Sequence, residues 1–165
     1  MREQGDAPVS RREFLVQGSV AVASAGFCVC GLGGCATITG NGATSRLAAD
    51  AIAKTNDENI VIDLGKVPTL ATVGGAIKVV DRKDVKPIII ARVAEASFVV
   101  ASIKCPHRGV EVEYHGERKQ FVCASIGSST FGLNGALLSG PAKKPIQIFD
   151  NIFADGKLTI RGVAV

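Results

Sequence analysis

Aromatic residues and histidines are scarce in this chain, and their scarcity argues against two kinds of function. Only 5% of the residues are aromatic, with no tryptophan and one tyrosine, so the chain lacks stacking side chains for single-stranded nucleic acid. The net charge of +4 is not gathered into a basic stripe, which also disfavours nucleic-acid binding. Two histidines, neither of them close to a candidate serine in the sequence, give no nucleophile–base pair. We therefore expect no catalytic site of its own.

Charge is absent from a long N-terminal segment, which predicts export. No charged residue lies between Glu13 and Arg46, and this gap holds an apolar run rich in small residues from Phe14 to Ile38. The hexapeptide S-R-R-E-F-L at residues 10–15 precedes the run and resembles the twin-arginine (Tat) signal pattern S-R-R-x-F-L. Tat machinery moves folded proteins, so we expect the domain that follows to lie outside the cytoplasm.

The end of this leader predicts a membrane attachment. The stretch L-G-G-C-A at residues 32–36 resembles a bacterial lipobox, in which Cys35 becomes the acylated first residue. An uncleaved anchor is the alternative, because the apolar run is long enough to span a bilayer. The glycines in residues 31–34 weaken a helix and favour processing. Either way, we expect residues 1–35 to be a Tat-like signal, lipoprotein leader or anchor. The chain would then lie at the outer face of the bacterial cytoplasmic membrane, in the periplasm, and be anchored there.

Beyond the leader, a tether and one all-β domain are predicted. Residues 36–58 are small and polar at first, include a possible short helix at 46–54, and are expected to be mainly a tether. Over residues 59–165, β-branched runs alternate with turn signals at close spacing, which is typical of a β sandwich or barrel. The expected strands are Ile60–Leu64, Ala76–Asp81, Lys86–Val93, Ser97–Ile103, Glu111–Tyr114, Gln120–Cys123, Ile146–Phe149, Asn151–Ala154 and Lys157–Arg161.

Two short loops carry the chemically informative residues. The first is C-P-H-R-G at residues 105–109, and the second is C-A-S-I-G-S at 123–128, followed by F-G-L-N-G at 131–135 and G-P-A at 140–142. This order resembles the Rieske [2Fe-2S] domain family over nearly all of 59–165. In that family the loops are C-x-H-x-G and C-x-x-H-G-S, and an F-D-x-x-G turn and a G-P-A loop follow. The resemblance implies an antiparallel Rieske-type β sandwich or barrel with a small cluster-binding subdomain.

The resemblance also implies a cofactor, its ligands and a partner. Cys105 and Cys123 would bind the inner iron of a [2Fe-2S] cluster, and His107 would bind the outer one. Two imidazoles on the outer iron raise the reduction potential of such a cluster. A domain of this kind would be an electron-transfer subunit of an oxidoreductase, with a cytochrome b- or c-type partner in a membrane complex. The residues implied to shield the cluster are Ser128, Gly140 and Pro141.

The second loop departs from the family pattern at a ligand position. Ile126 stands where the family has its second histidine, and isoleucine has no lone pair to bind iron. Its neighbour Gly127 cannot replace it, and Phe131 follows Cys123 by eight residues where the family usually has seven. The other histidine, His115, is expected to be a solvated turn residue at the far end of a hairpin. An apolar side chain at a vacated ligand position can fill the space that a metal would leave.

Three outcomes remain open for this site. A cluster can persist with water, hydroxide or a backbone group as its fourth outer ligand. Two thiolates and one imidazole with an open position also suit a single Zn²⁺ ion. In the third outcome no metal binds and Cys105 pairs with Cys123, which an oxidising compartment favours. Val110 and Ser125 stand where many family members carry an additional disulfide. The functions that follow are electron transfer, a clusterless structural or interaction subunit of a membrane redox complex, and mononuclear metal binding.

Charged residues near the loops have two interpretations. Arg108, Lys143 and Lys144 lie in or beside them and can form a basic rim for an acidic partner, although isolated loop charges are more often simply solvated. Glu111 and Glu113 alternate along an expected strand, so both should point to one face, which we take to be the solvent face.

Overall fold

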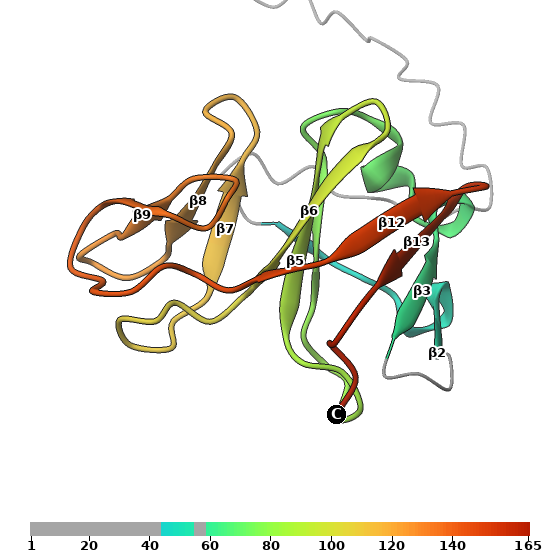
Figure 1. The fold of residues 1–165 in the computed structure, drawn as a ribbon, viewed down its shortest axis with the longest axis horizontal. Helices are drawn as coiled ribbons and strands as arrows, with labels where there is room; N and C mark the ends of the chain where they lie inside the picture. Colours follow the sequence, from blue (N-terminus) through green and yellow to red (C-terminus); the bar gives the residue numbers. More distant parts are fainter. Residues whose placement is uncertain (1–43, 55–58) are drawn as a thin grey trace, which may run out of the picture. The chain divides into compact units, whose positions relative to one another are not determined.

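The computed structural model describes residues 44–54 and 59–165, which belong to one folded unit (Figure 1). The Tat-like motif, the lipobox and Cys35 lie outside the described residues. Within the described ranges, no helix is long and apolar enough to cross a membrane.

The unit is built almost entirely from short strands, so the predicted all-β fold is confirmed. Over residues 44–54 and 59–165, the helical elements are three short 3₁₀ turns, η2 (Ala49–Ala51), η3 (Leu64–Lys66) and η4 (Pro68–Ala71). The strands are β1 (Ser45–Arg46), β2 (Ile52–Lys54), β3 (Ile60–Asp63), β4 (Ala76–Val79), β5 (Ile88–Ala94), β6 (Ser97–Ser102), β7 (Val112–His115), β8 (Gln120–Cys123), β9 (Thr130–Phe131), β10 (Leu137–Ser139), β11 (Ile148–Phe149), β12 (Asn151–Ala154) and β13 (Lys157–Ile160).

These strands form three sheets. The central sheet has the order β1-β4-β5-β6-β11, and a second sheet has the order β12-β13-β3-β2. The third, which we call the loop sheet, has the order β10-β9-β8-β7. Figure 1 shows β5 and β6 between the loop sheet at one end and β2, β3, β12 and β13 at the other.

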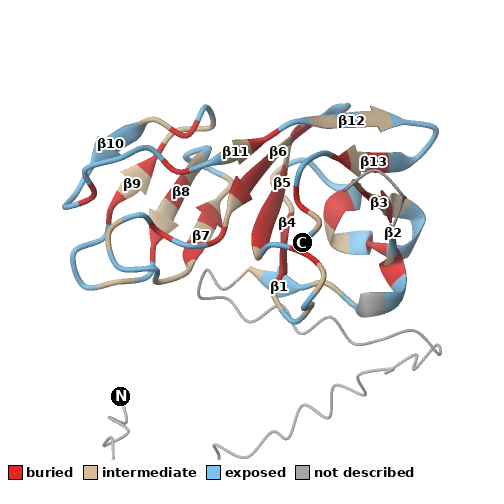
Figure 2. Cartoon of the chain, turned by 60° about the horizontal axis from the view of Figure 1, so that its bottom comes forward, coloured by how far each residue is buried: buried red, intermediate tan, exposed pale blue. Residues whose placement is uncertain are grey.

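The apolar run in β5 explains how the central sheet lies between two cores. Successive strand residues point to opposite faces, so a strand covered on both faces needs a continuous apolar run. Ile88 and Ile90 pack into a core with residues of β3 and β13. Ile89 and Ala91 pack into a second core that includes residues of β7, β8 and β9. Figure 2 shows the resulting buried stretch along β4, β5 and β6.

Part of the predicted tether belongs to the sheets. Within residues 36–58, β1 pairs in parallel with β4, and β2 pairs with β3 in antiparallel register. A short helix over 46–54 is therefore wrong, apart from the single 3₁₀ turn η2. Strands of two or three residues are too short to show a hydrophobic period, which is why the sequence did not predict β1, β2, β9 or β10.

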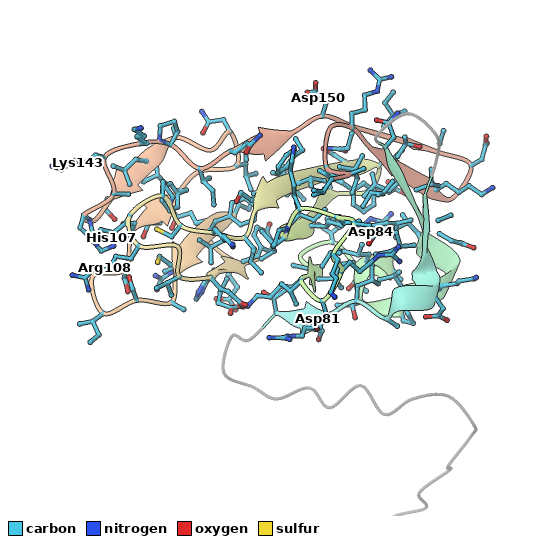
Figure 3. The ribbon with its side chains drawn as sticks, turned by 90° about the horizontal axis from the view of Figure 1, so that it is seen from below. Asp81, Asp84, His107, Arg108, Lys143 and Asp150 are labelled. Carbon is cyan, nitrogen blue, oxygen red and sulfur yellow. The ribbon has the colours of Figure 1, made fainter. Side chains whose placement is uncertain are left out.

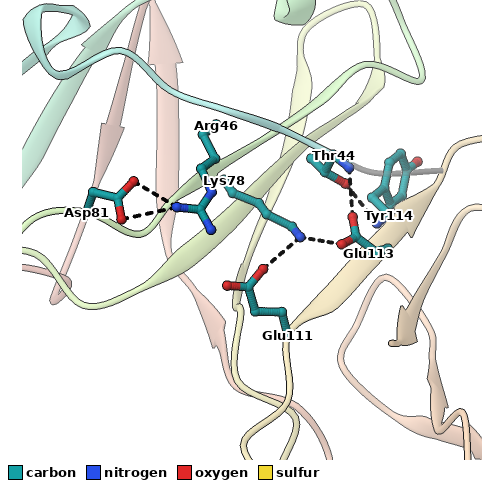
Figure 4. A network of polar contacts seen from close by, with 7 residues as sticks. All are labelled: Thr44, Arg46, Lys78, Asp81, Glu111, Glu113 and Tyr114. Atoms are coloured by element: carbon teal, nitrogen blue, oxygen red, sulfur yellow. Dashed lines mark hydrogen bonds and ion pairs between the residues drawn. The ribbon is translucent and has the colours of Figure 1, made fainter. Parts of the chain in front are cut away.

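A buried lysine links the loop sheet to the central sheet (Figure 4). The Lys78 side chain on β4 is 6% exposed and forms ion pairs with Glu111, at 2.9 Å, and with Glu113. Glu113 also accepts a hydrogen bond of 2.7 Å from the backbone N–H of Thr44. The two glutamates share one face as predicted, and both pair with Lys78. The expectation that this face meets solvent is wrong for Glu113, whose side chain is 19% exposed, whereas the Glu111 side chain is 41% exposed.

Candidate metal centre

The first loop is a tight turn at the end of the central sheet. An isolated bridge between Lys104 and Glu111 holds its two ends together. Inside it, the Cys105 N–H donates to the Val110 carbonyl at 2.9 Å, and the Gly109 N–H donates to the Cys105 carbonyl at 2.8 Å. Gly109 has a φ of 71°, a conformation that glycine adopts at little cost. The loop backbone therefore fixes where Cys105 lies.

The second loop leaves β8 beside the first. Cys123 is paired with Val112 of β7, and its N–H donates to the Ser129 carbonyl at 2.8 Å. Ser128 donates its hydroxyl to the Ser125 carbonyl at 3.0 Å, so its side chain holds the loop backbone. The hydroxyl beside a cysteine sulfur belongs instead to Ser125, whose Oγ lies 3.2 Å from Cys123 Sγ. Sequence reasoning missed this contact, although a serine two residues after a cysteine can fold back on it.

The third loop packs directly on the second. Gly140 has a φ of 96°, and a Cβ there would lie 2.5 Å from Ser129 Cα, so only glycine fits. A Cβ on Gly127 would lie 2.9 Å from Pro141 Cγ. The Ala142 N–H donates to the buried Ser129 Oγ at 3.0 Å. These contacts put the G-P-A segment against the loop that begins at Cys123.

Cys105 and Cys123 are free thiols, 2% and 1% exposed, and both belong to the same apolar core. Burial raises the pKa of Cys105; the His107 backbone N–H opposes this effect, and the Cys123 thiol adds to it. Burial acts on Cys123 in the same direction, but hydrogen bonds from the Ser125 hydroxyl and N–H and from Cys105 outweigh it, so the pKa of Cys123 is lowered.

His107 lies half-buried on the first loop, at the same end of the molecule as the sulfur atoms, Arg108 and Lys143 (Figure 3). Its Nδ1 atom is buried and has no hydrogen-bond partner within the described part of the chain. In the same part of the chain, no three Cys, His, Asp or Glu side chains converge closely enough to hold a metal ion. Cys105 and Cys123 thus share one apolar core, and His107 lies at the same end of the molecule.

Two sequence predictions about neighbouring residues are wrong. Ile126 does not fill a gap in the site: its side chain is fully exposed, at 108% of the reference value, because Gly127 beside it packs on Pro141. His115 is half-buried and is the last residue of β7, opposite Gln120, so it is a strand residue and not part of the turn. It lies three residues beyond Val112, about 10 Å along the strand from the cysteine end.

Comparison with known proteins identifies the family. The family model of the Rieske [2Fe-2S] domain matches residues 63–150, which is 88 of the 165 residues. The chain belongs to the Rieske [2Fe-2S] domain family, as its loops predict. No curated protein sequence gave a match.

Solved structures similar to this chain are Rieske-type proteins and their complexes. The plasma membrane Rieske protein PetC3 of Synechocystis PCC 6803 has 19% identity and a TM-score of 0.44, covering 52% of this chain and 84% of its own. The ferredoxin of carbazole 1,9a-dioxygenase from Nocardioides aromaticivorans IC177 has 17% identity and a TM-score of 0.46, covering 55% and 86%. A complex of reduced oxygenase and oxidized ferredoxin in carbazole 1,9a-dioxygenase contains a chain with 20% identity and a TM-score of 0.47, covering 57% and 86%.

Proposed function

We propose that this chain is an exported, membrane-tethered Rieske-fold protein that acts by binding a partner in a membrane redox complex, without a [2Fe-2S] cluster of its own. The observation that carries the proposal is Ile126. It occupies the position of the family's second histidine and presents a fully exposed apolar side chain to solvent. Such a residue cannot bind iron, whereas it suits a protein contact.

The donor atoms do not fit the family's cluster. A Rieske centre needs two thiolates and two imidazoles. This sequence has only two histidines, and His115 lies about 10 Å up the strand from the cysteines. That leaves Cys105, Cys123 and His107 as the available ligands, so we derive no electron-transfer step through this site.

Exposed apolar and basic side chains are concentrated in the second loop and in the segments next to it in the sequence. Within the described residues, six large hydrophobic side chains are exposed, and half of them lie on the second loop and β10. No Asp or Glu occurs from Arg118 to Phe149, so basic residues face no acidic neighbour within that stretch. Exposed apolar and basic side chains suit a partner that offers apolar and acidic groups. The exposed residues concerned are Ile126, Leu137, Leu138, Arg108, Lys143 and Lys144.

Metal analysis tests the absence of a cluster. The full chain, isolated without oxygen and reconstituted with iron and sulfide, is expected to remain colourless with substoichiometric iron. Two irons and two labile sulfides per chain, with the spectrum of a Rieske centre, would contradict the proposal. Ile126→His restores a fourth donor and should bind more iron than Ile126→Ala. If it does not, the additional residue between Cys123 and Phe131 is a second defect.

Native electrophoresis of gently solubilised membranes tests the contact. The wild-type chain is expected to migrate within a larger complex, and Ile126→Asp is expected to release it. Ile152→Asp is the matched control, because Ile152 is also an exposed isoleucine (49%) but lies on β12, in another sheet. A wild-type chain that migrates alone, or equal release by both variants, would argue against the contact.

A single metal ion is the second candidate for this site. The observation that favours it is the buried, unpartnered Nδ1 of His107, on the same loop as Cys105. Two thiolates, an imidazole and an open position suit Zn²⁺. Zinc bound at one equivalent per chain and lost in His107→Ala would favour this candidate over the first.

A further inference from the structure

The first described residues of the chain form a short strap across the edges of two sheets (Figure 4). We infer that this strap, residues 44–47, is releasable and that its release lengthens the tether between the folded domain and the membrane. The role of the strap rests on the proposed membrane attachment. Its docking rests only on contacts between described residues.

One end of the strap covers an edge of the loop sheet. β7 is the last strand in the order of that sheet. The Thr44 N–H donates to the Glu113 carboxylate at 2.7 Å, and the Tyr114 N–H donates to Thr44 Oγ1 at 3.4 Å. Glu113 and Tyr114 are consecutive residues of β7, so one threonine pairs with both a side-chain acceptor and a backbone donor of that strand.

The rest of the strap lies along the edge of the central sheet. β1 is the outermost strand there and pairs in parallel with β4. Ser45 lies opposite Ile77, and Arg46 lies opposite Lys78. The Leu47 N–H continues this pairing with a hydrogen bond of 2.8 Å to the Lys78 carbonyl. The strap therefore connects β4 with β7 from outside both sheets.

Few buried contacts hold the strap, so its release should cost little. Ser45 and Arg46 are exposed, and Leu47, the only apolar side chain of the strap, packs on the core while only partly buried. The ion pair of Arg46 with Asp81 joins two side chains that are 59% and 75% exposed, and such surface pairs contribute little. Segments with few buried apolar contacts open at a small fraction of the global free energy of unfolding.

Release should stop at the next element along the chain. Ala51 of η2 is 3% exposed and belongs to the core that β3 and β13 share, and β2 pairs with β3 along its whole length. Lys78 keeps both glutamate partners when the strap leaves, because these ion pairs do not involve Thr44. Opening therefore leaves the cores and the buried ion pairs in place.

Release lengthens the tether by a definite amount. Residues 44–47 span about 14 Å when fully extended, and this gain is the same wherever the leader is attached to the membrane. The second loop can then meet a partner surface farther from the membrane. A partner at that distance favours the released strap, since binding shifts a conformational equilibrium toward the form that is bound better.

Limited proteolysis of the full chain tests the strap, because the Arg46–Leu47 bond lies inside it. Trypsin should cut this bond slowly in the wild-type chain and fast in the urea-unfolded chain. Thr44→Pro removes the N–H that Glu113 accepts, which should speed the cut roughly tenfold while the Tm changes by less than about 2 °C. Mass spectrometry of fragments that begin at Leu47 measures the rate.

Thr39→Pro is the matched control, since it makes the same replacement in the tether ahead of the strap. It should leave the rate at Arg46 unchanged, and an equal acceleration by both variants would contradict the role of the Thr44 contacts. A wild-type chain cut at Arg46 as fast as the unfolded chain has no docked strap. A cut that waits for global unfolding means that the strap is a fixed part of the fold. Each of these results overturns the inference.

Hydrogen exchange supplies a readout that needs no variant. The Leu47 amide should exchange at least about 100-fold faster than the amides of β3, which lies between β2 and β13. Equal protection would count against release.

Energy transfer in reconstituted vesicles tests the added reach. A dye on Ile152→Cys should transfer less energy to acceptor-labelled lipid headgroups when Thr44→Pro is also present. Equal transfer from a strap that proteolysis shows to be released would overturn the lengthening. A chain that does not float with the vesicles refutes the proposed membrane attachment and the role of the strap, whereas its docking is decided by proteolysis alone.

Discussion

Replacing Lys78 by methionine is expected to lower the free energy of unfolding by about 3 kcal/mol, because it leaves two carboxylates without their shared cation. Lys78 is almost fully buried between β4 and β7, and Glu113, one of its partners, is mostly buried as well (Figure 4). Glu111 is more exposed and can regain water, which places the expected cost at the lower end for a broken buried pair. Urea unfolding followed by circular dichroism measures this difference.

Arg46→Ala is the matched control for the buried ion pair. Arg46 pairs with Asp81 at 3.0 Å, but the two side chains are 59% and 75% exposed, so removing this pair should cost less than about 1 kcal/mol. Adding Glu113→Gln to Lys78→Met should recover part of the loss, since one uncompensated charge is then removed. If Lys78→Met is as mild as Arg46→Ala, the buried network does not join the sheets.

Phe121→Ala is expected to destabilise the protein by about 3–5 kcal/mol, since it opens a cavity in the core beneath the two loops. Phe121 lies on β8, is fully buried and pairs with Phe131 of β9. Its ring centroid lies 5.3 Å from that of Tyr114 on β7, so one side chain contacts both neighbours in the loop sheet. The same urea titration measures the effect.

A more conservative change tests whether packing is the cause. Phe121→Leu keeps an apolar side chain of smaller size and should cost less than half as much as alanine. Ile152→Ala, on an exposed position of β12, should stay within about 0.5 kcal/mol of wild type. Equal losses for Phe121→Ala and Phe121→Leu would point to lost ring contacts and away from cavity volume.

Much of the fold was predictable from the sequence because strands of four or more residues show β-branched or alternating apolar residues between turn signals. Gln120–Cys123 and Asn151–Ala154 were predicted with the bounds that the structure has, and Ile60–Leu64 differs by one residue. Strands β9 and β10 were not predicted because each has only two or three residues. Their pairing depends on neighbours and not on a pattern of their own.

The site was predictable in its chemistry and less so in its geometry. Residue type and spacing in the two cysteine loops predicted the family, and the family match confirms the family. The outward orientation of Ile126 was not predictable, because it depends on Pro141 packing against Gly127. Ser125 was noted only for its position, while its contact with Cys123 depends on how the second loop folds back.

The sequence by itself determined which donor atoms this protein has: two thiols and one imidazole in the loops, with an isoleucine at the remaining ligand position. Donor chemistry belongs to the side chain, so it can be read without coordinates. Only the tertiary structure decided that both cysteines are buried in one apolar core with the Ser125 hydroxyl beside Cys123, and that Lys78 joins two sheets through Glu111 and Glu113. These arrangements depend on contacts between residues far apart in the chain, and no local pattern encodes such contacts.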